Sequence, residues 1–188
     1  MALTLEAART ALRRALADTA APVAWSDDDL DRALAGALAA LDGLAPWSGT
    51  VLLAAGGSDR LPLPGAVRRV VAVLQDGVPL AGWHVWAGEL VLAEPVQGTL
   101  EVRAFLARTL PGAPSDPLPL ADGAEEAFVL AAARETLLAV GLTHHARRQG
   151  PPGPLVAALA TARAERERAA RALPRVVRTV PHRVTPGP

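Results

Sequence analysis

The segment WSDDDLDRAL, residues 25–34, carries four aspartates within five positions: Asp27, Asp28, Asp29 and Asp31. Carboxylates at this density could hold a divalent cation. A calcium loop, however, also needs a glycine and a distal glutamate at set positions, and the segment has neither. The spacing instead favours the start of a helix. Ser26 is a preferred N-cap residue, and Asp29, three positions later, can accept a hydrogen bond from the Ser26 amide as in a capping box.

The residues on either side of Ser26 support a helix start. Trp25 precedes the cap and Leu30 falls at the fourth helical position, which are the two positions of a hydrophobic staple. Acidic side chains in a first helical turn also interact favourably with the helix dipole, by roughly 0.3 to 1 kcal/mol each. We therefore interpret Trp25, Ser26, Asp29 and Leu30 as a structural helix cap and expect no metal there.

No other group of residues indicates a catalytic centre. The chain has no cysteine, which excludes disulfides and thiolate chemistry, and it has no lysine, which excludes a Walker phosphate loop at Gly56-Gly57-Ser58-Asp59. We interpret that glycine pair as a hairpin turn. His144 and His145 are adjacent on an expected helix and point about 100° apart, so they suit the negative end of the helix dipole better than a shared metal. We expect no catalytic residue, no metal and no cofactor.

The charges are unevenly distributed along a chain of zero net charge. Of its 188 residues, 51% are hydrophobic and 20% charged, which suits one globular domain or two small ones. Residues 1–146 carry 17 acids against 10 arginines, a balance of −7, whereas residues 147–188 carry 9 arginines against 2 glutamates, a balance of +7. Such a basic segment predicts an anionic partner: nucleic acid, an anionic surface or an acidic protein, including another copy of the same chain.

Two further features predict an intracellular protein that makes no membrane contact. No segment approaches the roughly 18 uninterrupted apolar residues of a membrane helix. The N-terminus also places Glu6 ahead of its arginines, which is not the layout of a signal peptide.

Apolar residues spaced three and four apart predict four helices. The first spans residues 3–17, and the second begins at the Ser26 cap and ends at Gly43, a residue type that suits the position after a helix. A third begins with Asp122 as N-cap and Glu125 three positions later. A fourth begins at Pro154, after a Gly-Pro-Pro-Gly break, and ends in an arginine-rich face.

Between the second and third helices, short runs rich in Val, Leu and Trp alternate with glycine-containing turn signals. These runs are residues 51–55, 67–74, 83–86, 89–92 and 99–107. They predict an antiparallel meander of four or five strands, and the alternation of apolar and polar residues in 99–105 predicts one buried face. Residues 109–121 hold four prolines, so we expect a linker or a strap across the surface.

The expected fold is therefore α+β. About four helices, from residues 1–45 and 122–172, form a bundle, and residues 46–108 form an inserted antiparallel β meander. A proline-rich strap, residues 109–121, leads back to the bundle, and residues 173–188 form an extended basic tail.

Four arginines on the fourth helix could contact phosphates: Arg163, Arg166, Arg168 and Arg171. Glu165 and Glu167 interleave with them, so half of this helix is interpreted as a solvated, salt-linked face. The tail that follows has no aromatic residue to stack on bases.

The order of elements, with a second helix opened by VAWSDDDL (residues 23–30), resembles that of the head-to-tail adaptor, or connector, proteins of tailed phages and gene transfer agents. A second block is LPLPGAVRRVVAVLQDGVPLAGWHVWAGELVLAEPVQGTLEVRAF, residues 61–105. It is similar to the stretch in which a Leu-Pro strand leads to an Asp-Gly hairpin, a Gly-Glu-Leu strand and a Gly-Thr turn. The resemblance touches most of residues 1–145, and the tail departs from it most.

The resemblance implies a structural virion component that is not an enzyme. Such proteins form a ring, commonly of twelve copies, in the neck between the portal protein and a tail or head-completion protein. They are made in the host cytoplasm, and their helices surround a channel through which DNA passes without sequence-specific binding. An acidic body would repel the DNA phosphates. The basic tail would dock on the portal or a neighbouring copy through Arg175, Val176, Val177, Arg178, Val180, Arg183 and Val184.

Two other classes of function fit the residues. The first is a nucleic-acid-binding module that uses the arginines of the fourth helix, and it predicts affinity that falls steeply with salt. The second is a small enzyme in which Asp27, Asp28 or Asp29 acts with His144 or His145 around a metal. That alternative predicts stoichiometric metal in the purified protein.

Overall fold

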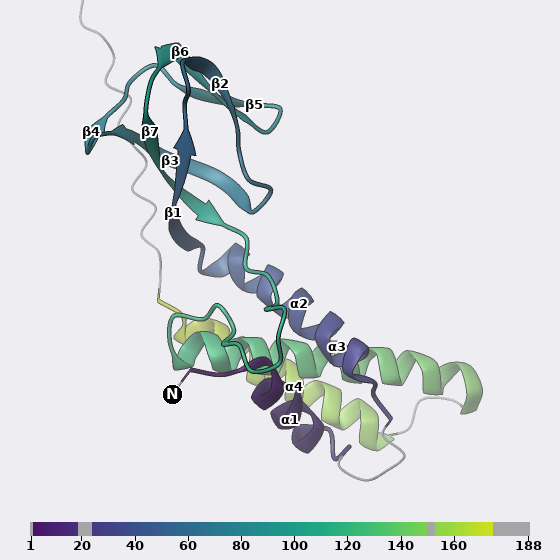
Figure 1. The fold of residues 1–188 in the computed structure, drawn as a ribbon. Helices are drawn as coiled ribbons and strands as arrows, with labels where there is room; N and C mark the ends of the chain where they lie inside the picture. Colours follow the sequence, from purple (N-terminus) through teal and green to yellow (C-terminus); the bar gives the residue numbers. More distant parts are fainter. Residues whose placement is uncertain (1, 19–23, 150–152, 175–188) are drawn as a thin grey trace, which may run out of the picture.

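Helices form the lower part of the molecule in Figure 1, and strands form the upper part. The computed structural model describes residues 2–18, 24–149 and 153–174. Its helices are α1 (Leu5–Ala15), α2 (Asp27–Leu44), α3 (Gly123–Gln149) and α4 (Gly153–Ala172). Its strands are β1 (Trp47–Ala54), β2 (Ser58–Pro62), β3 (Val67–Gln75), β4 (Val78–Pro79), β5 (His84–Trp86), β6 (Glu89–Val96) and β7 (Thr99–Leu106). The predicted α+β class, with four helices and antiparallel strands, is confirmed.

Helix α2 begins as its sequence predicts. The Ser26 hydroxyl accepts the Asp29 amide at 3.2 Å, and the Asp29 carboxylate accepts the Ser26 amide at 3.2 Å, which completes the capping box. The predicted end at Gly43 was wrong, because the helix runs to Leu44 and the Ala45 amide still donates to the Leu41 carbonyl. Buried Leu41 and Ala45 hold this last turn in the core, so no left-handed residue is needed to end it.

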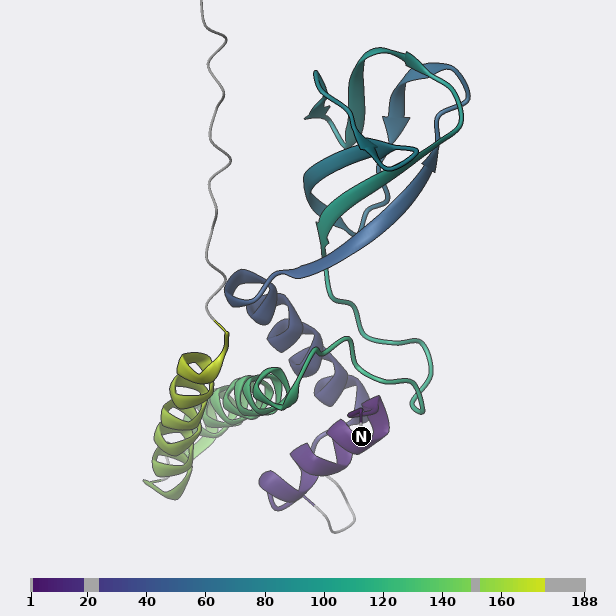
Figure 2. The same ribbon diagram turned by 90° about the vertical axis from the view of Figure 1, so that its left-hand side faces the viewer.

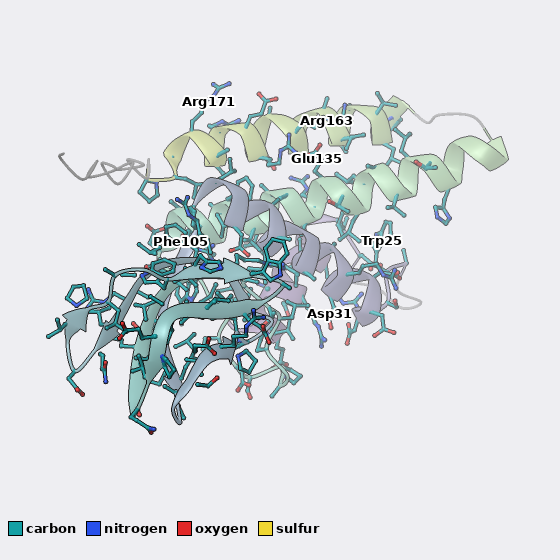
Figure 3. All side chains as sticks on the ribbon, turned by 90° about the horizontal axis from the view of Figure 1, so that it is seen from above. Trp25, Asp31, Phe105, Glu135, Arg163 and Arg171 are labelled. Carbon is teal, nitrogen blue, oxygen red and sulfur yellow. The ribbon has the colours of Figure 1, made fainter. Side chains whose placement is uncertain are left out.

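The helical core forms around α3, which packs against α1, α2 and α4 (Figures 1 and 2). Leucines spaced three and four apart give α2 one buried face, as predicted: Leu30, Leu34, Leu38 and Leu41. They meet Phe128 and Val129 of α3 in one cluster. Trp25 packs against the same cluster, and a Cβ at Gly141 would lie only 3.3 Å from its Cζ2, so the glycine gives the indole room against α3 (Figure 3).

Helix α3 also has an unusual composition. From Gly123 to His144 it is long and apolar enough to cross a membrane by length and composition alone, and it is the only described helix that passes this test. The sequence analysis looked only for uninterrupted apolar runs, so it did not identify this helix. In the fold this stretch lies in the helical bundle, yet only 33% of its most apolar window is buried. Much of an apolar helix therefore remains accessible.

Carbonyl groups of the proline-rich strap accept hydrogen bonds from the first amides of α1. The first amides of a helix have no partner inside the helix. Here Leu5 donates to the Asp116 carbonyl at 3.1 Å and Glu6 to the Pro114 carbonyl at 2.9 Å, while the Thr4 hydroxyl accepts the Ala7 amide. Apart from one isolated bridge to Thr4, residues 109–121 contain no regular structure, which confirms the predicted strap.

The strands form two antiparallel sheets with the orders β1-β7-β3-β4 and β2-β6-β5, so the predicted sequential meander was wrong. Strands β2 and β4 were not predicted. The first strand pairs with the last over eight consecutive positions, from Trp47↔Leu106 to Ala54↔Thr99. The β part therefore leaves the bundle and returns to it at one point.

The turn signals fall into two kinds. Asp76-Gly77 and Ala87-Gly88 close two-residue hairpins, with φ of 51° and 80° in the first and 48° and 81° in the second, as a type I′ turn requires. Gly56-Gly57 and Gln97-Gly98 instead join strands of different sheets, so the predicted hairpin at Gly56-Gly57 was wrong. Sequence marks the turn, but it does not say which strands will pair across it.

Arg108 joins the β part to the bundle. Its guanidinium is 1% exposed and donates to the Asp42 carboxylate at 2.7 Å, the Glu125 carboxylate at 2.8 Å and the carbonyls of Ala45 and Pro119. It also lies 5.1 Å from the centre of the Trp47 ring. Glu125 was expected only as a residue of the helix start. Its carboxylate instead accepts hydrogen bonds from Arg108 and from the Ala121 amide. One buried cation thus binds α2, the strap, α3 and the first residue of β1.

We predict that Arg108→Ala lowers the free energy of unfolding by about 3 to 5 kcal/mol, because it leaves two carboxylates without their buried counter-charge. Arg103→Ala is the matched control, since Arg103 is 59% exposed and its ion pair should contribute less than about 1 kcal/mol. Urea denaturation followed by circular dichroism measures both. Equal losses for the two variants would contradict the role given to Arg108.

Candidate functional site

Two of the aspartates at the start of α2, Asp27 and Asp31, pair with arginines of α1. Asp31 accepts from Arg9 Nε at 2.7 Å and from Nη2 of the same guanidinium, and Arg13 donates to Asp27 at 2.7 Å. Among the residues that the structure describes, no three acids, histidines or cysteines are placed to hold a metal ion. The acidic segment is therefore a clamp between the first two helices. The sequence offered a signal for it, because Arg9 and Arg13 are four positions apart on one face of α1.

The ionisation of these groups agrees with this structural role. The hydrogen bond from Arg13 holds the pKa of Asp27 below its ordinary value. Hydrogen bonds from the Ser26 hydroxyl, and then from its amide, lower the pKa of Asp29. In the opposite direction, the hydrogen bond to Asp31 raises the pKa of Arg9. Each group is thus held in its charged form, which favours ion pairing over proton transfer.

His144 and His145 were the histidines that the sequence offered as metal ligands. Among the described residues, no histidine forms a metal-binding group with these carboxylates. His144 is exposed near the end of α3, and the side chain of His145 lies outside the described residues. Asp27 and Asp29 already pair with Arg13 and Arg32, so a metal at either carboxylate would have to displace an ion pair. The arrangement gives the metalloenzyme alternative no support.

The arginines of α4 divide into two groups. Glu135 of α3 pairs with Arg163 at 3.2 Å and with Arg166 at 3.1 Å. Figure 3 shows Glu135 and Arg163 facing each other between the two helices, whereas Arg171 points away from the bundle. Arg171 pairs within its own helix with Glu167 at 3.6 Å, and Arg168 makes no ion pair in the described part of the chain. Half of the row is therefore used to hold α4 on α3.

An open groove of about 840 Å³ runs along α3 between α2 and α4. Small residues create it, because Gly36, Ala40 and Ala132 leave the space that larger side chains would fill. Leu44 and Val140 are exposed on its walls. Polar groups of Glu135, Arg166, Glu167 and His144 also line it. This groove is an apolar surface edged by both signs of charge and is a candidate binding surface that sequence analysis missed.

The predicted docking residues of the tail lie outside the described residues. These are Arg175, Val176, Val177, Arg178, Val180, Arg183 and Val184. The described chain ends just after Leu173, which is buried in the helical core together with Ala45.

No protein-family model matches the chain, and no curated protein matches it at a significant level. The connector class expected from the order of elements and from residues 23–30 and 61–105 therefore stays a prediction.

We predict that stability falls in acid through the α1–α2 clamp. Because the folded-state pKa of Asp27 lies below the ordinary 3.8, its ion pair stabilises the fold above that pH, and this stabilisation is lost as the pH falls through the lower folded-state value. Asp27→Asn should lower stability at neutral pH by less than about 1 kcal/mol, since Asp27 is largely exposed, and should flatten the acid dependence. Urea denaturation across this pH range measures it. Asp59→Asn, at an exposed aspartate outside the clamp, should leave the pH dependence unchanged; an identical slope for Asp27→Asn and the wild type would contradict the prediction.

Proposed function

We propose that this protein is a structural adaptor that assembles as a ring between the portal and the tail of a phage-like particle and leaves a passage for DNA. The resemblance of its element order and of residues 61–105 to connector proteins suggests this class of function. The observation that carries the proposal is the groove along α3, because it offers a second polypeptide a surface that the single chain leaves uncovered. The protein acts by binding, with no reaction of its own.

The burial of α3 supports an assembled state. Exposed apolar surface costs roughly 25 cal/mol per Å², and contiguous apolar patches on proteins commonly mark interaction sites. The apolar stretch Gly123–His144 is only 33% buried in its most apolar window, and Val140 remains exposed. A neighbouring copy in the groove would cover this surface. A groove on one copy and a different complementary face on the next give a head-to-tail contact, which closes into a ring when the rotation allows.

The charge distribution supports both contacts of such a ring. Residues 1–146 carry −7 and residues 147–188 carry +7, so the basic end of one chain complements the acidic body of another chain or of the portal. A net acidic body also repels DNA phosphates, which favours passage over binding. Arg9 and Arg13 neutralise part of the α2 cluster, so the repulsion would come from the remaining acids.

The alternative of a nucleic-acid-binding module depends on the arginines of α4, and fewer of them are available to phosphates than the sequence indicates. Arg163 and Arg166 are compensated by Glu135, which leaves Arg168 and Arg171 as the outward-facing cations of the α4 row. Two phosphate contacts give only a shallow dependence of affinity on salt. DNA affinity that falls steeply with salt, and that is lost when Arg163, Arg166, Arg168 and Arg171 are all replaced by alanine, would favour this alternative over the adaptor.

We predict that Gly36→Trp prevents assembly, whereas Gly43→Trp does not. Both glycines are exposed in α2, and a Cβ added to either meets no atom within 4 Å, so both variants should fold. Only Gly36 lines the groove. Electron microscopy and sedimentation, with and without portal protein, should show rings with an open channel for the wild type and Gly43→Trp. The same assembly by Gly36→Trp, or a wild-type monomer that ignores the portal, would contradict the proposal.

We also predict that deletion of residues 174–188 leaves a folded protein that no longer docks on the portal. The deletion removes three arginines and four valines but leaves the buried Leu173 in place. Co-sedimentation with portal protein measures docking, and circular dichroism measures folding. Substituting the three arginines with glutamine in the full-length chain separates the contribution of charge from that of the valines. Retained docking by the truncated protein would rule out this role for the tail.

A further inference from the structure

A pocket of about 580 Å³ lies in the β part, between the start of β3 and the turn from β5 to β6. Its walls are mostly aliphatic, with contributions from Leu63, Val67, Val70 and Val85. The Leu63 amide donates to the Gly88 carbonyl at 2.9 Å, which ties the two sides of the pocket together. This site is separate from the α3 groove, and none of the described helices contributes to it.

Two exposed arginines, Arg68 and Arg69, line this pocket. Neighbouring residues on a regular strand point to opposite faces, but the register of β3 with β7 shifts between Val67 and Arg69. This irregularity accounts for two consecutive arginines lining one pocket. Neither has a carboxylate oxygen within 4 Å in the described structure, whereas the other arginines of the β part do: Arg60 with Glu89, Arg103 with Glu101 and Arg108 with Asp42.

The strand beside the pocket has an open edge. Within the described residues, strand β5 pairs only with β6 and ends its three-stranded sheet, so its outer backbone groups have no strand partner there. Val85 is 45% exposed and Trp86 is 68% exposed on this edge strand. An unpaired edge of this kind accepts an extended segment of another chain by adding a strand to the sheet.

We propose that this part of the molecule binds an acidic, extended segment of another protein. The segment adds to the free edge of β5, places an aliphatic side chain among Leu63, Val70 and Val85, and presents carboxylates to Arg68 and Arg69. A protein segment suits the site better than a nucleic acid, because the pocket walls are aliphatic and no aromatic residue lines it for base stacking. The proposal does not depend on ring assembly or on the portal, so the two can fail independently.

The test is a titration of the full-length, ¹⁵N-labelled protein with a short synthetic peptide in which glutamate alternates with valine. Saturable shifts of the amides in residues 63–70 and 84–88 are expected. A peptide with lysine in place of glutamate should not bind. Absence of binding by the glutamate peptide, equal binding of the lysine peptide, or shifts confined to α4 would overturn the proposal. So would binding of single-stranded oligothymidylate at residues 63–70 in place of the peptide.

Two pairs of variants separate this site from general charge effects. Arg68→Glu combined with Arg69→Glu should weaken peptide binding about tenfold or more, whereas Arg103→Glu, at an exposed arginine already paired with Glu101, should not. Val85→Ser should weaken binding, and Val71→Ser, at an exposed valine of β3 outside the pocket, should leave it unchanged. All of these side chains are exposed, so the variants should fold. Unchanged affinity in the double arginine variant would overturn the proposal.

Discussion

The buried guanidinium of Arg108 determines how the two parts of this protein are joined. A cation with 1% exposure is stable only if its donors are paired, and here α2 supplies Asp42, α3 supplies Glu125, and the chain on either side supplies the carbonyls of Ala45 and Pro119. Because β1 leaves the bundle and β7 returns to it at this point, one side chain sets the position of the whole β part. The larger apolar core of the helices and the apolar core of the strands are separate clusters, and the two parts of the chain meet at this polar junction.

Elsewhere, charge compensation separates the structural charges from those available to a partner. The aspartates at the start of α2 are held by Arg9 and Arg13, and Glu135 holds two arginines of α4 against α3. The cations that remain without a carboxylate in the described structure include Arg68, Arg69 and Arg168. The first two border an aliphatic pocket and an open strand edge. Surfaces of this kind, together with the groove along α3, suit a protein that works by contacting other chains.

The accuracy of the sequence-based predictions depended on the range of the interaction involved. Helix caps, the positions of the glycine-containing turns, the alternating face of β7 and the irregular proline-rich segment 109–121 were predicted correctly, since each depends on residues close together in the chain. The meander, the hairpin at Gly56-Gly57 and the end of α2 were wrong. Strand order depends on pairing between residues far apart in the chain, such as Trp47 with Leu106, and no local pattern encodes it. The end of α2 likewise depends on the burial of Ala45 in the core.

The sequence by itself determined the four helices, five of the strands, the polarity of their faces and the division of charge along the chain, because periodicity, capping and turn chemistry act over a few residues. Only the tertiary structure decided which charges are compensated and which surfaces stay open. From the sequence, the arginines from Arg163 to Arg171 could all have contacted phosphates. In the structure, Glu135 of α3 pairs with Arg163 and Arg166, so half of these arginines hold α4 against α3. Arg68 and Arg69 carried no signal in the sequence. They became a candidate binding site because a strand irregularity, an aliphatic pocket and the edge of β5 come together in space.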